Sequence, residues 1–107
     1  MSEAHLPLLP IEAQVFHLQR NEPSEFTRRR GMELLGKALA ENGSTPLDCE
    51  YEPIVHPSDR RSDLRVYVAA ETADGAEPVI KELGYKIIHS HPASIQIKEV
   101  PDFGSVA

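Results

Sequence analysis

The sequence predicts an α+β domain with the ferredoxin-like, split βαβ plan, in which a mainly antiparallel sheet carries two helices on one face. Segments that alternate like strands and two amphipathic segments with the period of a helix follow one another in the order β-α-β-β-α-β. The chain has 107 residues, enough for one domain, and 40% of them are hydrophobic. Right-handed crossovers place both helices on the same face and leave the other face open.

The predicted domain spans residues 11–100, between an extended N-terminal arm at 1–10 and a C-terminal tail at 101–107. The arm contains two prolines among apolar residues and follows neither the strand nor the helix period. Residues 11–20 are rich in β-forming residues and alternate imperfectly between apolar and polar side chains, which predicts the first strand.

Helices are predicted at residues 24–42 and 77–83. In the first, apolar residues recur every three or four positions and form one stripe. A capping residue precedes this helix, a proline suited to a first turn opens the second, and a glycine that can end a helix follows each. These residues are Asn21 or Ser24 as the cap, Met32, Leu35 and Leu39 in the stripe, Pro78 in the opening turn, and Gly43 and Gly84 at the ends.

The remaining strands are predicted at residues 47–55, 64–71 and 85–100. The first of these alternates apolar with acidic residues, which is typical of a strand with one face in water. In the last, the tetrapeptide HSHP at 89–92 separates two apolar runs, and we expect it to break the strand because proline has no N–H. The middle strand has an inward set of Leu64, Val66 and Val68 and an outward pair of Arg65 and Tyr67.

Charge and composition narrow the class of protein. The net charge of −6 repels phosphate, and residues 64–71 lack the glycine–aromatic pattern of RNA-binding sheets, so nucleic acid is disfavoured as a partner. The single cysteine, Cys49, fits a reducing compartment, and the first basic residue, Arg20, comes too late for a secretory signal. No apolar run approaches the ~20 residues that cross a bilayer. We therefore expect a cytoplasmic protein without membrane contact.

The histidines of HSHP are the strongest candidates for a metal site. In an extended segment His89 and His91 point the same way, and with His56 and the nearby Asp59 they make a two- or three-histidine set with a carboxylate, of the kind that binds zinc. HSHP resembles the metal-binding His-x-His-Pro core of the JAMM metalloproteases, which would imply zinc ligation by these two histidines. The resemblance covers four residues. The Ser-x-x-Asp that supplies that family's third ligand is absent, because Ser94 has Ile97 in the place of the aspartate.

Other features of the sequence favour a protein that is not an enzyme. The chain has neither the G-x-S-x-G of a nucleophile elbow nor a glycine loop of the phosphate-binding kind. Cys49 alternates with apolar neighbours, which predicts a buried and inert thiol. We therefore expect no catalytic residues and no cofactor, and we expect HSHP to have a structural role without a bound metal.

The predicted function is that of a protein-binding module, such as an accessory, regulatory, assembly or inhibitor subunit. Its open sheet face would contact a partner protein or a second copy of the chain, because aromatic and arginine residues are enriched in interface hot spots. The imperfect alternation of residues 11–20 also allows the opposite orientation of that strand. The alternative function is that of a small metal-dependent enzyme or metal-binding protein that uses His56, His89 and His91. The predicted partner-binding residues are Phe16, Leu18, Arg20, Arg65 and Tyr67.

Overall fold

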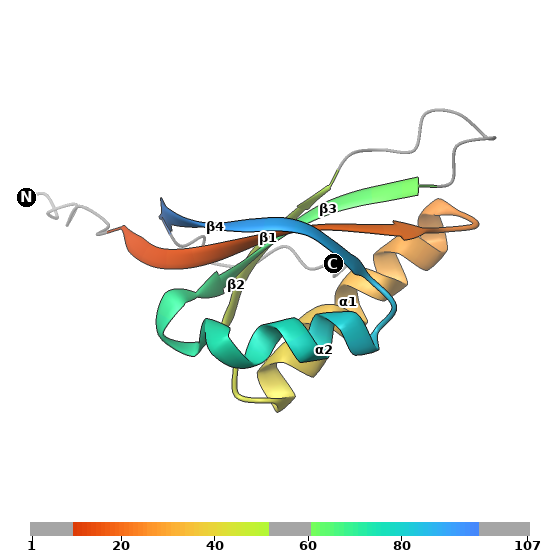
Figure 1. The fold of residues 1–107 in the computed structure, drawn as a ribbon. Helices are drawn as coiled ribbons and strands as arrows, with labels where there is room; N and C mark the ends of the chain where they lie inside the picture. Colours follow the sequence, from red (N-terminus) through yellow and green to blue (C-terminus); the bar gives the residue numbers. More distant parts are fainter. Residues whose placement is uncertain (1–9, 52–60, 97–107) are drawn as a thin grey trace, which may run out of the picture.

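Four strands and two α-helices make up the part of the chain that the computed structural model describes, residues 10–51 and 61–96 (Figure 1). The predicted tail and nearly all of the predicted arm lie outside these residues. In chain order the elements are β1 (Ile11–Asn21), α1 (Glu25–Glu41), β2 (Pro46–Tyr51), β3 (Arg61–Ala69), the 3-10 helix η1 (Ala70–Gly75), α2 (Ala76–Glu82) and β4 (Lys86–Ile95).

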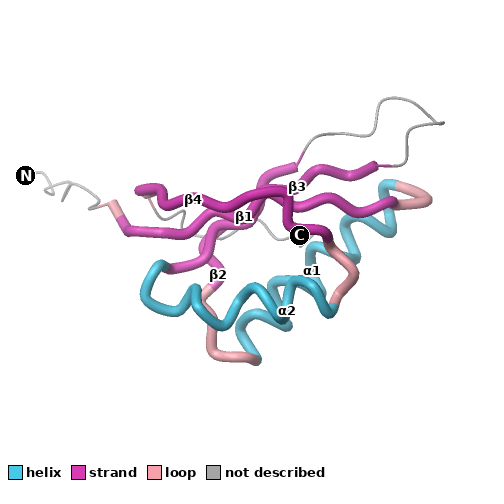
Figure 2. The backbone as a smooth tube through the Cα atoms, viewed as in Figure 1, coloured by secondary structure: helices cyan, strands magenta, loops and turns pink. Residues whose placement is uncertain are grey.

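The strands form one antiparallel sheet in the order β2-β3-β1-β4, so that β1 lies inside the sheet and β4 at one edge. Both helices lie on the same side of this sheet (Figures 1 and 2). The predicted α+β class, with a four-stranded antiparallel sheet and two helices, is confirmed.

One local prediction differs from the structure. The HSHP tetrapeptide does not break the last strand, because β4 continues through it to Ile95. An edge strand tolerates Pro92 since a missing N–H on the solvent side removes no bond from the ladder.

Helix α1 begins and ends where its caps predict. The Ser24 side chain accepts a hydrogen bond from the Thr27 backbone N–H, and the Thr27 hydroxyl accepts one from the Ser24 N–H, which makes a capping box. Gly43 follows the helix with a φ of +89°, a backbone conformation that favours glycine. Neither described helix combines the length and the apolar character needed to cross a membrane.

The main core lies between the helices and the sheet, and it corrects the predicted orientation of β1. Phe16 and Leu18 are only 4% and 1% exposed and pack in this core rather than on the open face. Their cross-strand partners on β3 are Val66 and Leu64, which were correctly predicted to face inward. Directly paired residues point to the same face of a sheet, so the pairing with β3 determines the orientation of β1.

Arg20 also lies away from the open face and is held on the helix side. Its Nε donates to Glu22 at 2.6 Å and its Nη1 donates to the Leu83 carbonyl at 2.8 Å. The guanidinium lies 4.1 Å from the centre of the Tyr85 ring. A Cβ added at Gly31 of α1 would clash with Arg20 and would lie 2.6 Å from the Tyr85 hydroxyl oxygen. The absence of a side chain at Gly31 therefore allows Arg20 and Tyr85 to pack against the helix.

This contact predicts that Gly31→Ala destabilises the protein, although alanine is the better helix former by about 1 kcal/mol. Overpacking a filled site costs roughly 1–3 kcal/mol, and here the buried Tyr85 and the partly exposed Arg20 must both move. We expect the free energy of unfolding, measured by urea denaturation, to fall by about 1 kcal/mol. Gly75→Ala is the control, because Gly75 has a φ of −89° and nothing within 4 Å of the added Cβ. A Gly31→Ala variant as stable as the parent would contradict the prediction.

Candidate metal centre

A bulge in the pairing of β1 with β4 aligns histidines from the two strands. His17 pairs with His89, but the next residue of β1, Leu18, pairs with Ile87, so Ile88 is the extra residue. Ile87 packs against the main core, whereas His89 is exposed. In a regular strand these two residues would point to the same face. The bulge therefore directs Ile87 inward and His89 outward.

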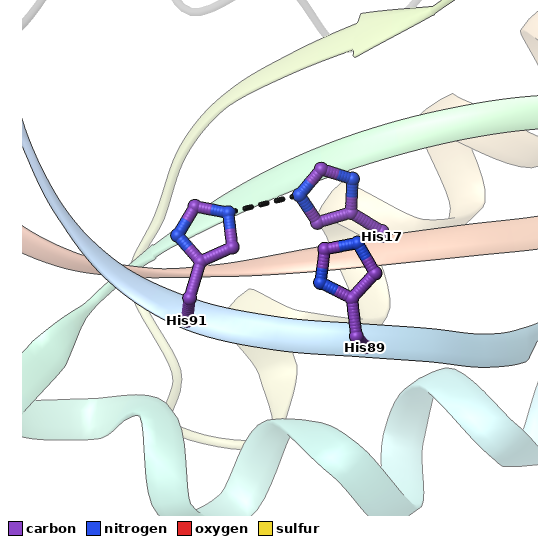
Figure 3. Close-up of side chains that lie close together, drawn as sticks. All are labelled: His17, His89 and His91. Carbon is purple, nitrogen blue, oxygen red and sulfur yellow. Dashed lines mark hydrogen bonds between the residues drawn. The ribbon is translucent and has the colours of Figure 1, made fainter.

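Three imidazoles meet on the face opposite the helices (Figure 3). His17 comes from β1, and His89 and His91 come from β4. Their rings lie close together, with centroids separated by 4.0 Å for His17–His89, 5.1 Å for His17–His91 and 5.8 Å for His89–His91. One ring nitrogen from each residue lies within 4.8 Å of the other two. We call these three residues the histidine cluster.

The hydrogen bonds of His91 orient its lone pair toward the cluster. The carbonyl of Pro92 lies 3.1 Å from His91 Nδ1 and accepts the proton there, which leaves Nε2 as the nitrogen with the lone pair. That Nε2 lies 3.0 Å from His17 Nε2, which donates to it. A ligating histidine in a metal site almost always donates its second ring N–H in this way, to a carboxylate, a backbone carbonyl or a water.

The surroundings of His17 favour the neutral form that a metal requires. Partial burial lowers the pKa of His17 below 6.5, and the positive charges that His89, His91 and Arg65 can carry lower it further. At pH 7 the His17 imidazole is therefore neutral, and one of its nitrogens offers a lone pair. A metal ion would replace the hydrogen bond between His17 and His91, and the remaining proton of His17 would move to Nδ1.

The spacing of the cluster fits a small divalent transition metal ion. Zinc–nitrogen bonds of 2.0–2.1 Å place two ligand nitrogens of a tetrahedral site about 3.3 Å apart. The 3.0 Å between His17 and His91 is already close to this value. The planes of His17 and His89 are inclined by only 16°, so the His89 ring must turn about its Cβ–Cγ bond to share the ion. This torsion is broad in histidine, and the His89 side chain is exposed.

A polar group and a shallow depression border the cluster. Arg65 is paired with His17 across β1 and β3, and its Nε donates to Glu50 at 3.1 Å. Tyr67 donates to the same Glu50 oxygen at 2.8 Å. A depression of about 240 Å³ includes His17, His89, Arg65 and Ile88 in its wall, and Ile88 is 44% exposed. The predicted outward orientation of Arg65 and Tyr67 is therefore confirmed.

The structure assembles only part of the predicted sites. Of the five predicted partner-binding residues, the open face holds Arg65 and Tyr67, whereas the other three lie on the helix side. Of the alternative metal set, His89 and His91 come together, and His56 lies outside the described residues. His17 was not predicted as a ligand. The predicted plan already places the first strand, residues 11–20, beside the last one. Which residue of that strand lies next to His89 depends on the register, and the register depends on the bulge.

The lowered pKa of His17 predicts that stability decreases with acidification. Because the unfolded chain has the higher pKa, it takes up the proton more readily once the pH falls below 6.5. The contribution of His17 to the free energy of unfolding is fully present above pH 6.5, and it is lost as the pH falls through the pKa of His17 in the folded state. NMR titration of the His17 ring should give a midpoint below 6.5, and Arg65→Gln should raise it by removing a positive charge. A midpoint at or above 6.5 in the parent protein would contradict this prediction.

Comparisons with known proteins do not identify the chain. Searches of protein-family models, of curated proteins and of solved structures find no match to it. Functional assignment therefore depends on the chemistry of the histidine cluster and of the open face around it.

Proposed function

We propose that the protein binds one divalent transition metal ion, most simply zinc, through His17, His89 and His91. The single observation that carries this proposal is the convergence of three ring nitrogens, one from each residue, within 4.8 Å. Neutral imidazole suits zinc, copper and nickel, whereas magnesium and calcium take oxygen ligands. Among the residues that the structure describes, this group of ligands consists of the three histidines and contains no carboxylate.

A purely structural role explains the cluster less well. Two of the three histidines are exposed, so their contacts bury little apolar surface. Protonation of more than one ring would place like charges side by side, which destabilises the fold. A bound cation removes that repulsion and uses the lone pair that the Pro92 carbonyl directs toward the cluster.

The fold supplies the surface for such a site. We infer that the arrangement of elements is the ferredoxin-like, split βαβ plan, supported by the strand order β2-β3-β1-β4 with antiparallel neighbours throughout. In this plan both helices cover one face, and the strands of the other face can present side chains to a ligand. The plan itself carries no specific function, so the assignment depends on the histidines.

The proposal predicts that the untagged protein binds one zinc ion per chain, measured by isothermal titration calorimetry. We expect His17→Ala, His89→Ala and His91→Ala each to weaken binding at least about tenfold, because the loss of even an outer-shell partner costs 10–100-fold. Circular dichroism should show that each variant is folded. Zinc binding that is unchanged in all three variants would contradict the assignment.

Two control variants distinguish the cluster from other histidines and from the strand that carries it. Ser90→Ala changes the residue between His89 and His91, and Ser90 pairs with the inward-facing Phe16. The double variant His5→Ala, His56→Ala removes the two histidines that are not part of the cluster, and its change at His56 tests the one member of the sequence-suggested set that the cluster lacks. Both controls should bind zinc with the affinity of the parent protein.

Protein contact through the open face is a second candidate function, favoured by the exposed Ile88 beside Arg65. Tyr67 lies on the same face and supplies an aromatic of the type common in hot spots. If a second copy of the chain binds there, Tyr67→Ala should weaken self-association at least about tenfold, since truncating a hot spot costs ~2 kcal/mol or more. Analytical ultracentrifugation measures this, and a strict monomer at all concentrations would exclude self-association.

A further inference from the structure

The proposed metal would have a vacant position for a reactant. Zinc usually takes four ligands, and the described residues supply three at this site. His89 and His91 are exposed on the face opposite the helices, so the fourth position opens to water. Three protein ligands plus one water is the arrangement of catalytic zinc, whereas structural zinc has four protein ligands.

The charge of the ligand set favours a reactive water. Neutral imidazoles leave the full 2+ charge on the metal, whereas each thiolate or carboxylate ligand would reduce it. A zinc ion held by three histidines lowers the pKa of its water to about 7, so that hydroxide forms at neutral pH. Zinc-bound hydroxide is a nucleophile for carbonyl carbon.

The depression beside the cluster provides a place for a substrate. It shares His17 and His89 with the metal site, and its volume of about 240 Å³ limits it to a small molecule. Arg65 and Asp63 both contribute to its wall, and Arg65 is also paired with Glu50, so these acidic and basic side chains carry no net positive charge. Ile88, 44% exposed, gives the same wall an apolar surface. An uncharged molecule with a short apolar part matches this lining better than a polyanion.

We propose that the zinc-loaded histidine cluster hydrolyses small, uncharged carboxylic esters bound in this depression. The inference rests on the metal binding proposed above. The zinc-bound hydroxide oxygen forms a bond to the ester carbonyl carbon, and the carbonyl oxygen becomes an oxyanion beside the metal. The oxyanion collapses and breaks the bond to the alcohol oxygen, which leaves with the proton of the attacking hydroxide. A new water binds the zinc and releases a proton to the buffer, so ester and water give carboxylate, alcohol and one proton.

The depression gives Ile88 a role in selectivity. The acyl group of the ester has to lie against the wall while its carbonyl carbon lies near the metal. Ile88 is the extra residue of the bulge, next to the ligand His89, so its side chain is well placed to contact a short acyl chain. Its removal should change the preference between acyl chains without changing the ligands of the metal.

The test uses the full chain with one equivalent of zinc and 4-nitrophenyl acetate as the probe. We expect the kcat/KM of the zinc-loaded protein to be at least about tenfold above the second-order rate constant of free zinc. It should exceed that of the protein in chelator by the same factor, and this second comparison corrects for cleavage by the imidazoles without metal. His89→Ala should abolish the zinc-dependent part, and Ser90→Ala should leave it unchanged. Ile88→Ala should retain zinc affinity but lower the rate with 4-nitrophenyl butyrate relative to acetate.

The outcomes separate this inference from the proposed function. If zinc binds as predicted and hydrolysis does not exceed that of free zinc, the cluster is a binding site and the esterase inference is wrong. If calorimetry detects no zinc binding, both proposals fail. If Ile88→Ala hydrolyses the esters with zinc but keeps the parent ratio of butyrate to acetate rates, the substrate does not bind in the depression. That result would overturn the depression as the substrate site.

Discussion

The position of β1 between β3 and β4 is the constraint on which both the core and the candidate site depend. Antiparallel pairing with β3 places Phe16 beside Val66 and Leu18 beside Leu64, so these side chains share the face that the helices cover. The residues of β1 that alternate with these point away from the helices. His17 is one of them, which is why one strand contributes both to the core and to the histidine cluster.

The pairing of β1 with β4, on its other side, requires a bulge. A regular ladder with β4 could not bury Ile87 and present His89 at the same time, because residues two apart share a face. The bulge at Ile88 resolves this conflict by changing the parity of β4 between the two. Bulges are common at sheet edges and beside functional sites, where they redirect a side chain. Here the same device also leaves Ile88 exposed beside the cluster.

The helix side of the sheet forms a firm support for this arrangement. Two arginines are held there against aromatic rings, Arg20 over Tyr85 and Arg28 over Tyr51, each at 4.1 Å from the ring centre. Arg28 is fully buried and pairs with Glu25 at the start of α1. Arg28 is buried although Glu25 is half exposed, so removing Glu25 would take a partner from a buried charge, and these contacts restrict how α1 lies on the sheet. A metal ion on the other face would in turn link β1 to the edge strand β4, and binding to the folded state alone would stabilise it.

Local sequence signals determined the elements of this protein, and pairing between distant residues determined its site. Gly43 predicted the end of α1 and Ser24, one of two candidate caps, its start, because caps act on the nearest backbone groups. The regular alternation of β3 predicted that Leu64 and Val66 face inward. The orientation of β1 was not predictable, since apolar residues of this strand face both sides of the sheet: Phe16 lies in the main core, and Val15 is buried on the face opposite the helices. The sequence likewise placed His89 and His91 on one face, but their partner His17 is separated from His91 by 74 positions. Only the register of β1 against β4, set by burial of Ile87 and by the bulge, brought the three rings together.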